Sequence, residues 1–168
     1  LIALEKEALL KTINDSIDTA FTECLSPYFR NKNQALLTIE RKRCQVILVD
    51  WLTIEKERPP FTIIAHEQSQ KLNISGLSLS LRIDRIDQLE NGKRMIIDYK
   101  TGTQKVTDWF GSRPTEPQLP LYCINSENVG AIAIGQVNKK EMLYKGVASN
   151  VDSKSKHYAF KTVDKYIA

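Results

Sequence analysis

The sequence is poor in the residues that build metal-linked or disulfide-linked frameworks. Its 168 residues include 3 cysteines, at positions 24, 44 and 123, and their spacing offers no Cys-x-x-Cys or Cys/His zinc motif. An iron–sulfur cluster held by cysteine needs more thiolates than these, so we expect none. Free thiols of this kind are typical of a reducing compartment, and we therefore expect a cytoplasmic protein.

Other functional classes are disfavoured by similar shortages. The chain has 2 histidines, His66 and His157, and neither has a convincing partner for a zinc hydrolase or a Ser-His-Asp arrangement. It has no glycine-rich phosphate loop, so an ATP-driven motor would have to lie elsewhere in a parent protein. No apolar run approaches the ~20 residues that a membrane helix requires. We therefore expect no membrane partner.

What the sequence does contain fits one globular domain spanning residues 1–168. Its hydrophobic content is 42%, enough for a core, and its net charge of +4 permits a nucleic-acid partner without requiring one. The chain begins with Leu1 in a pattern that already resembles a helix interior, so we expect a piece of a longer protein. The lack of a signal peptide then says little about location.

Hydrophobic spacing changes once along the chain. Residues 1–24 and 33–57 repeat apolar side chains at helical intervals, and Pro59 and Pro60 stop the second helix, giving a helical N-terminal part at 1–58. From Phe61 the period becomes that of strands. A bend at Gly76 and a tight turn at Asn91 and Gly92 then predict a three-stranded antiparallel meander. Its strands are 61–69, 72–89 and 94–100.

The remaining residues alternate between loop, helix and strand. Residues 103–117 resemble an irregular loop and 118–124 a short helix; 129–137 resembles a buried strand and 142–147 an edge strand. Polar residues 149–157 resemble a loop. The order of elements predicts an α/β fold of α+β character, with a core at 59–147 and a C-terminal tail at 148–168.

The strongest candidates for chemistry lie in the meander. Asp98 and Lys100 share a face of one strand, which is apolar on both sides from Met95 to Ile97 until the acid appears. The alternative for this pair is a surface ion pair. Asp84 lies seven residues before Asn91 and Asp98 lies seven after it, so the hairpin makes them near cross-strand neighbours. Asp87 falls on the opposite face.

Two such close carboxylates repel unless a cation lies between them, and oxygen ligands suit Mg²⁺ or Mn²⁺. Glu67, one strand earlier, is a candidate third ligand or a partner of a metal-bound water; the alternative is a surface glutamate. Lys100 beside such a metal could polarise the attacking water or stabilise charge on a phosphate. A structural ion-pair cluster in an unrelated domain remains a further alternative.

A set of motifs in order carries a family resemblance. It runs through Glu67, then Arg82 to Asp87 (Arg-Ile-Asp-Arg-Ile-Asp), then Ile97 to Gly102 (Ile-Asp-Tyr-Lys-Thr-Gly), then Gln118 to Tyr122 (Gln-Leu-Pro-Leu-Tyr). Over roughly residues 50–125 it resembles the nuclease domain of RecB and AddB proteins, a branch of the PD-(D/E)XK nuclease superfamily.

The resemblance implies a restriction-endonuclease-like core, in which helices flank a central mixed sheet. It also implies a Mg²⁺- or Mn²⁺-dependent DNA nuclease that acts within a larger DNA repair or recombination protein, with a helicase module or subunit as a partner. By position, Glu67, Asp84, Asp98 and Lys100 match catalytic residues, the three acids being the metal ligands. Further residues are expected to organise the site and contact DNA: Gln118, Tyr122, Arg85 and Thr101.

The sequence departs from the family pattern in two places. Relatives have a glycine two or three residues before the first aspartate, where this chain has Leu81 and Ser80. They often carry a metal-binding histidine in an N-terminal helix, and neither predicted helix contains one. The survival of all four catalytic positions favours an enzyme, most simply an exonuclease. The missing histidine favours the alternative, an inactive nuclease-like module that grips DNA or a helicase.

Overall fold

The structure is a computed structural model that describes residues 6–149 and 156–162. The chain divides into two compact units, Leu1–Glu57 and Arg58–Ala168, a boundary close to the one expected from the change in hydrophobic spacing. The first unit is helical and the second contains the sheet. The expectation of a single domain stays a prediction.

The helical unit contains α1 (Lys6–Cys24), α2 (Pro27–Lys32) and α3 (Gln34–Lys56). α1 and α3 pack against each other, and a hydrogen bond of 3.0 Å joins Gln45 to Asn14 between them. α1 ends at Cys24, as expected, and α2 is an additional short helix that begins at Pro27. Proline is well suited to the first helical turn, and the Ser26 hydroxyl caps this one by accepting from the Phe29 N–H at 3.2 Å.

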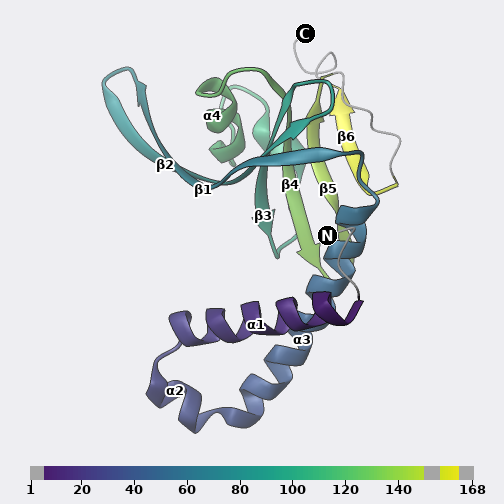
Figure 1. The fold of residues 1–168 in the computed structure, drawn as a ribbon. Helices are drawn as coiled ribbons and strands as arrows, with labels where there is room; N and C mark the ends of the chain where they lie inside the picture. The colour runs from purple at the N-terminus through teal and green to yellow at the C-terminus, as the bar shows by residue number, and fades with distance from the viewer. Residues whose placement is uncertain (1–5, 150–155, 163–168) are drawn as a thin grey trace. The chain divides into compact units, whose positions relative to one another are not determined.

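The second unit is built on a mixed sheet of six strands in the order β1-β2-β3-β4-β5-β6 (Figure 1). The antiparallel meander is confirmed, but its first turn lies at Ser75 and Gly76 and not between residues 69 and 72. Its strands are β1 (Phe61–Ile74), β2 (Leu77–Leu89) and β3 (Arg94–Lys100). β4 (Val129–Asn138) pairs parallel to β3, and β5 (Glu141–Ala148) pairs antiparallel to β4. The predicted α/β fold with a mixed sheet is therefore the observed one.

The C-terminal side of the sheet differs from expectation. β5 was expected at an edge, but β6 (Tyr158–Thr162) pairs parallel to it and takes the edge position. Contacts distant in sequence hold β6: the Tyr158 hydroxyl accepts from Arg58 Nε at 2.9 Å, and its ring lies 5.7 Å from that of Tyr144. The predicted loop at 149–157 and tail at 148–168 lie mostly outside the described residues.

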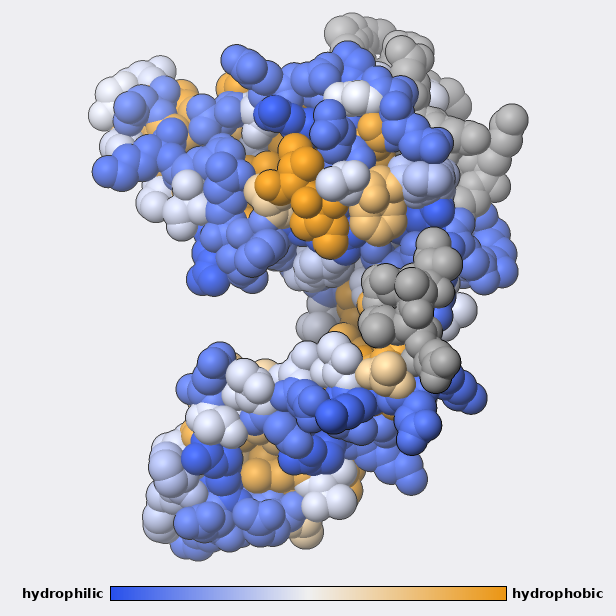
Figure 2. All heavy atoms as spheres, viewed as in Figure 1, coloured by the Kyte–Doolittle hydropathy of each residue, from blue (hydrophilic) through white to orange (hydrophobic). Residues whose placement is uncertain are grey.

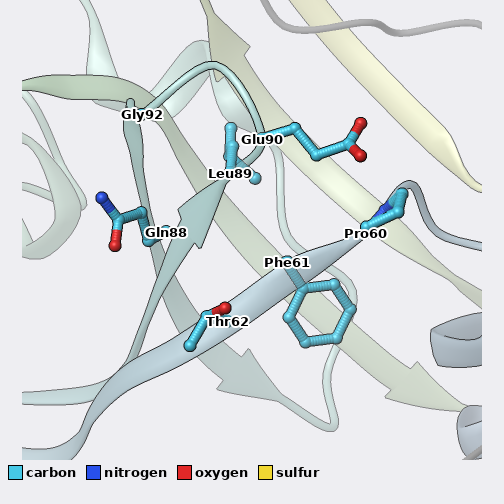
Figure 3. Close-up of a pocket in the computed structure, with 7 residues that line it drawn as sticks. All are labelled: Pro60, Phe61, Thr62, Gln88, Leu89, Glu90 and Gly92. Carbon is cyan, nitrogen blue, oxygen red and sulfur yellow. The ribbon is translucent and has the colours of Figure 1, made fainter.

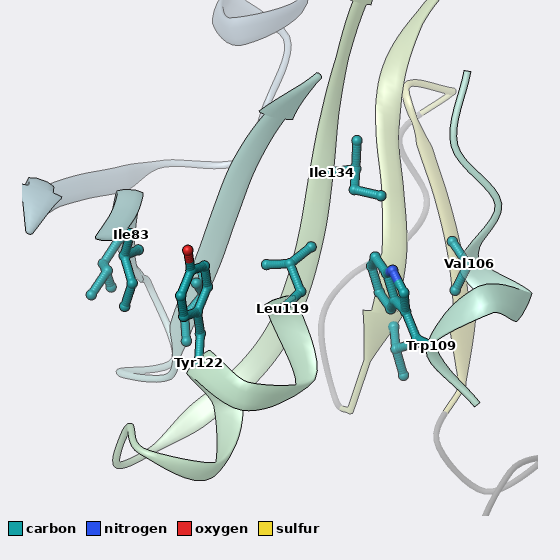
Figure 4. Close-up of a cluster of buried hydrophobic side chains, with 9 residues drawn as sticks. Ile83, Val106, Trp109, Leu119, Tyr122 and Ile134 are labelled. Carbon is teal, nitrogen blue, oxygen red and sulfur yellow. The ribbon is translucent and has the colours of Figure 1, made fainter. Parts of the chain in front are cut away.

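One face of the sheet is covered by α4 (Gln118–Ile124) and a short 3-10 helix, η1 (Val106–Trp109), which falls within the expected irregular loop. Val106 and Trp109 meet Leu119 and Tyr122 of α4 over the strands, as Figure 4 shows. The strands contribute isoleucines and a valine to this core: Ile83, Ile86, Ile96, Ile134 and Val147. The end of β3 therefore lies beside the first turn of α4.

The surface is mostly hydrophilic. On the face drawn in Figure 2, polar side chains predominate over the sheet unit and apolar ones gather in a small patch. β1 carries exposed apolar side chains at Ile63 and Ile64. In the part of the chain that the structure describes, no helix has both the length and the apolar content needed to cross a membrane.

Candidate active site

Asp84 and Asp98 lie level with each other on neighbouring strands. The β2–β3 register pairs Arg85 with Ile97, which places Asp84 opposite Asp98 at the next step and confirms the neighbours predicted from the turn. Asp84 Oδ2 also accepts the Tyr99 N–H at 2.8 Å. The hairpin thus brings two carboxylates together where the pairing of β2 with β3 ends.

Asp98 is a buried acid with a cationic partner. Its side chain is 3% exposed, and Lys100 Nζ lies 2.7 Å from its Oδ2. Burial raises the pKa of Asp98; the hydrogen bond and charge of Lys100 oppose that effect, and the charges of Asp84 and Glu116 add to it. Ionised Asp98 is therefore costly without more positive charge nearby.

Lys100 remains protonated in this setting. Burial lowers its pKa, but the hydrogen bond and charge of Asp98, with the charge of Asp84, outweigh burial and raise the pKa overall. The lysine side chain is still 35% exposed. It can therefore offer a proton donor to a group arriving from solvent while it stays paired with Asp98.

α4 connects the lysine to the body of the fold. Lys100 Nζ lies 3.4 Å from Gln118 Oε1, and Gln118 Nε2 donates to the Tyr122 hydroxyl at 2.6 Å. Tyr122, buried in the core, donates in turn to the carbonyl of Arg82 in β2. Gln118 and Tyr122 lie one helical turn apart on one face of α4. This chain of contacts fixes the position of Gln118 beside Lys100.

Glu116 is a residue that sequence reasoning missed. It lines a small hollow together with Asp98, Lys100 and Gln118, and its charge raises the pKa of Asp98. Its backbone N–H donates to the Asp108 carbonyl at 3.2 Å, which folds the loop before α4 toward the site. Its position two residues before Gln118 was the one available signal.

Glu67 is not brought to the two aspartates. It lies level with Asp84 on β1, yet its carboxylate pairs with Arg82 at 2.5 Å and its side chain is 54% exposed. A register shift between Ile63 and Ala65 and a φ of 50° at Glu67 interrupt the regular strand here. The carboxylate consequently points along the surface of the β1–β2 pair.

Arg85 is also placed away from the site. Its Nε lies 2.6 Å from Asp87 Oδ1, and its Nη1 donates to the Tyr99 hydroxyl at 2.9 Å. Asp87 is fully buried and also binds Arg58 at 2.7 Å, which confirms that it lies on the face opposite Asp84. A buried arginine held by a carboxylate is not available to DNA. Thr101 is exposed just after β3.

The two aspartates suit a divalent cation whose remaining ligands are water and substrate oxygens, and not a cation held by protein side chains alone. Among the described residues, no group of three or more His, Cys, Asp or Glu side chains could hold a metal ion. Mg²⁺ is commonly bound through one or two carboxylates, with water and substrate oxygens completing its shell. Asp84 and Asp98, adjacent and mutually repelling, match that donor set.

A second hollow, larger than the one beside Asp98, lies away from the aspartate pair. A shallow pocket of about 290 Å³ is lined by Pro60 to Thr62 at the start of β1, and by Gln88 to Glu90 and Gly92 around the β2–β3 turn (Figure 3). Glu90 is the one charged side chain in that lining. Without converging polar groups, the pocket is a weaker candidate for chemistry than the aspartate pair.

Comparisons with known proteins identify the family of the chain. No curated protein matches the chain. A solved structure titled "Crystal structure of SSO0001" matches at 16% identity over 74% of this chain, with a TM-score of 0.36, which does not establish a shared fold. The chain spans 62% of the length of that structure. The model of the PD-(D/E)XK nuclease superfamily matches residues 3–165. The chain therefore belongs to the PD-(D/E)XK nuclease superfamily.

Proposed function

We propose that this chain is a Mg²⁺- or Mn²⁺-dependent deoxyribonuclease domain that hydrolyses phosphodiester bonds in DNA. The observation that carries the proposal is the pairing of Asp84 with Asp98 across β2 and β3, with Lys100 held 2.7 Å from Asp98. Membership of a superfamily of nucleases supports the same reaction. Asp84 and Asp98 are the proposed metal ligands, and Glu67 is left outside the set.

The division of work follows from the geometry. A bound divalent cation would supply Lewis-acid chemistry and neutralise the two carboxylates. Lys100 is placed to donate a hydrogen bond to a phosphate oxygen or to the attacking water, and its raised pKa keeps the proton available. Asp98 orients Lys100 through their ion pair. Gln118 and Tyr122 hold the lysine against α4.

The resemblance to RecB and AddB proteins supports a finer proposal. The motifs that carry it are Asp84 to Asp87, Asp98 to Gly102 and Gln118 to Tyr122. We propose an exonuclease that acts within a DNA repair or recombination protein, beside a helicase module or subunit. Linear DNA that is degraded while circular DNA survives would support exonuclease action; cutting of the circle would contradict it.

One observation favours a second function, an inactive module that binds DNA or a helicase. The third acid expected at the site, Glu67, is occupied by Arg82, so the described site has fewer ligands than the motifs implied. Such a module would bind DNA and leave it intact at every metal concentration tested.

The test is cleavage of end-labelled linear DNA in Mn²⁺ or Mg²⁺ by the protein and by Asp98→Asn. We expect the substitution to lower the rate by several orders of magnitude. Glu90→Gln, in the turn of the same hairpin and outside the site, is the matched control and keeps the wild-type rate. Cutting that persists in Asp98→Asn would contradict the mechanism.

A further inference from the structure

Gln136 is a fully buried polar side chain on the face of the sheet that carries the candidate site. In the parallel register of β3 and β4, Gln136 pairs with Lys100. Two residues earlier, Ile134 pairs with Asp98 and lines the hollow beside it. Because alternate residues of a strand share a face, Gln136 lies on the same face as Ile134 and Lys100. Its exposed fraction is 0%, so its polar atoms have to be satisfied inside the protein.

Every hydrogen-bonding group of the Gln136 carboxamide has a partner. Its Nε2 donates to the carbonyl and to the carboxylate of Glu141, at 3.1 and 2.8 Å. Its Oε1 accepts from Lys145 Nζ at 3.1 Å and from the backbone N–H of Gln104 at 3.3 Å. A primary amide has two N–H donors and an oxygen with two acceptor positions, so all four are occupied. The orientation of this amide is therefore fixed, and it holds the backbone of Gln104 in one place.

Gln104 belongs to the loop that follows β3. Its neighbours in the loop, residues 101–103 and 105, are exposed, whereas Gln104 is half-buried and lines the hollow beside Lys100. Gln104 Nε2 would lie 4.0 Å from a Cβ placed on Gly102, so the side chain folds back toward the end of β3. The buried amide of β4 thus anchors a residue whose own amide lies beside the candidate site.

The side chain of Gln104 is available to a ligand. In the part of the chain that the structure describes, its carboxamide makes no hydrogen bond, whereas that of Gln118 is engaged by Lys100 and Tyr122. Glutamine and lysine side chains are both common donors to the phosphate oxygens of DNA. The hollow therefore offers a phosphate group two donors, the ammonium group of Lys100 and the amide of Gln104.

We propose that the Gln104 carboxamide donates a hydrogen bond to a phosphate oxygen of the DNA strand bound at Lys100, and that Gln136 is the positioning residue that presents it. The inference rests on the proposed nuclease function and adds a substrate-binding residue to it. Gln104 touches the substrate, whereas Gln136 acts only through the Gln104 backbone. Lys145 and Glu141 fix Gln136, since they bind the two ends of its amide.

Binding of fluorescent single-stranded and duplex DNA, measured by anisotropy in an Asp98→Asn background, tests the contact. Gln104→Ala is expected to weaken binding about ten-fold, the effect of one hydrogen bond to a charged group. The slope of log affinity against log salt should not change, because the amide carries no charge. Gln104→Glu keeps the shape of the side chain and brings a carboxylate to the phosphate, so it should weaken binding further.

The matched controls are Thr103→Ala and Thr103→Glu, one residue earlier in the same loop at an exposed position. Thr103→Glu adds the same charge at nearly the same place without facing the hollow. Gln104→Glu should therefore weaken binding more than Thr103→Glu does. Equal effects of the two glutamates would show general repulsion of DNA and would overturn the contact.

A double-mutant cycle tests the part played by Gln136. Gln136→Leu removes the acceptor of the Gln104 N–H and should weaken binding as Gln104→Ala does. The double variant should bind no more weakly than either single variant, because both changes remove one contact. The exchange Gln136→Glu/Glu141→Gln keeps an oxygen for Gln104 and a donor between the two exchanged side chains, so it should bind DNA like the Asp98→Asn protein. Additive losses, or an exchange that binds as weakly as Gln136→Leu, would overturn the positioning role. The Gln104 variants test the contact even where Gln136→Leu does not fold.

Cleavage by the otherwise wild-type protein separates this inference from the function beneath it. In that background Gln104→Ala should raise KM about ten-fold and leave kcat unchanged, because the bond to phosphate is made equally in the ground state and the transition state. Normal cleavage in which both Gln104 variants behave like the Thr103 variants would overturn the contact and leave the nuclease standing. A wild-type protein that neither binds nor cuts DNA would overturn both.

Discussion

Asp98 is ionisable, almost fully buried and beside a second carboxylate. Its pKa is raised in the folded chain by burial, so the unfolded chain releases this proton at a lower pH than the folded chain does. Between these two pKa values the folded state binds more protons, and the contribution of Asp98 to stability falls as pH rises. Above the pKa that Asp98 has in the folded chain, the full destabilising effect of its buried charge is present.

The first prediction concerns the metal-free protein. Asp98→Asn should be more stable than the wild type at neutral pH, and the difference should shrink as the pH falls through the raised pKa of Asp98, because protonation removes the buried charge. Urea unfolding at a series of pH values measures it, with Glu90→Gln as the exposed control. A stability difference that does not change with pH would contradict the assignment of the buried charge.

Tyr99 fixes the geometry of the aspartates from the opposite face of β3. Its backbone N–H binds Asp84 at 2.8 Å while its hydroxyl accepts from Arg85 at 2.9 Å, beyond the last paired residues of β2 and β3. The hydroxyl thus ties the end of β3 that extends beyond β2 to the buried Arg85–Asp87 pair. We interpret Tyr99 as a positioning residue for the proposed metal ligands.

The second prediction is that Tyr99→Phe weakens Mn²⁺ binding about ten-fold, since partners behind metal ligands have effects of that order. Calorimetric titration with Mn²⁺ measures it. Tyr158→Phe is the matched control: it removes a hydroxyl that binds Arg58 at 2.9 Å, from β6, which pairs with β5. Equal losses of Mn²⁺ affinity in the two variants would show a general effect on stability instead.

At the scale of elements, the pairing of β4 with β5 depends on a missing side chain. A Cβ at Gly146 would lie 2.1 Å from the Ile132 carbonyl oxygen and 2.9 Å from Ala133 Cα, both backbone atoms. Neither can rotate away, so a side chain there would push β4 and β5 apart. The same two strands contribute Ile134 and Val147 to the hydrophobic core shown in Figure 4.

The third prediction is that Gly146→Ala destabilises the protein by about 1–3 kcal/mol, the usual cost of overpacking, or prevents folding. Chemical denaturation measures it. Gly102→Ala is the control, since the nearest atom to its Cβ would be 4.0 Å away, and it should stay close to wild-type stability. Similar losses at the two glycines would contradict the explanation from close backbone contact.

Elements set by local sequence were predictable. The Asn91-Gly92 turn fixed the β2–β3 register, and Gln118 to Ile124 form the expected helix. α2 was not predicted, because its six residues include no buried side chain and so carry no apolar period, although Ser26 and Pro27 suit a helix start. β6 was missed because it is only five residues long and tertiary contacts of Tyr158 to Tyr144 and Arg58 hold it in place.

In the candidate site, too, residues placed by local sequence were predicted and residues placed by tertiary contacts were not. Asp84, Asp98, Lys100, Gln118 and Tyr122 are brought together, because one hairpin and one helical turn determine their spacing. Glu67 and Arg85 lie away from the two aspartates, since a register shift and a competing buried aspartate decide their directions. The roles of all the candidate site residues stay predictions.

At the scale of the whole molecule, the proposed cation links function to folding. A ligand that binds the folded state alone stabilises it by about 2.7 kcal/mol at a concentration one hundred times its Kd. The fourth prediction is that Mn²⁺ raises the Tm of the wild type and of Glu90→Gln but leaves that of Asp84→Asn unchanged. Differential scanning calorimetry measures it. An equal rise in all three would place the bound ion elsewhere on the chain.

The parallel pairing of β3 with β4 has a kinetic consequence. A short turn joins Asp84 to Asp98, whereas Gln118 reaches Lys100 only within the long crossover from β3 to β4. Hairpins form in about 1–10 μs, and parallel pairings with long loops form much later. The two carboxylates therefore meet early in folding, before the lysine is anchored. A divalent cation that neutralises them at that stage is expected to speed refolding as well as slow unfolding.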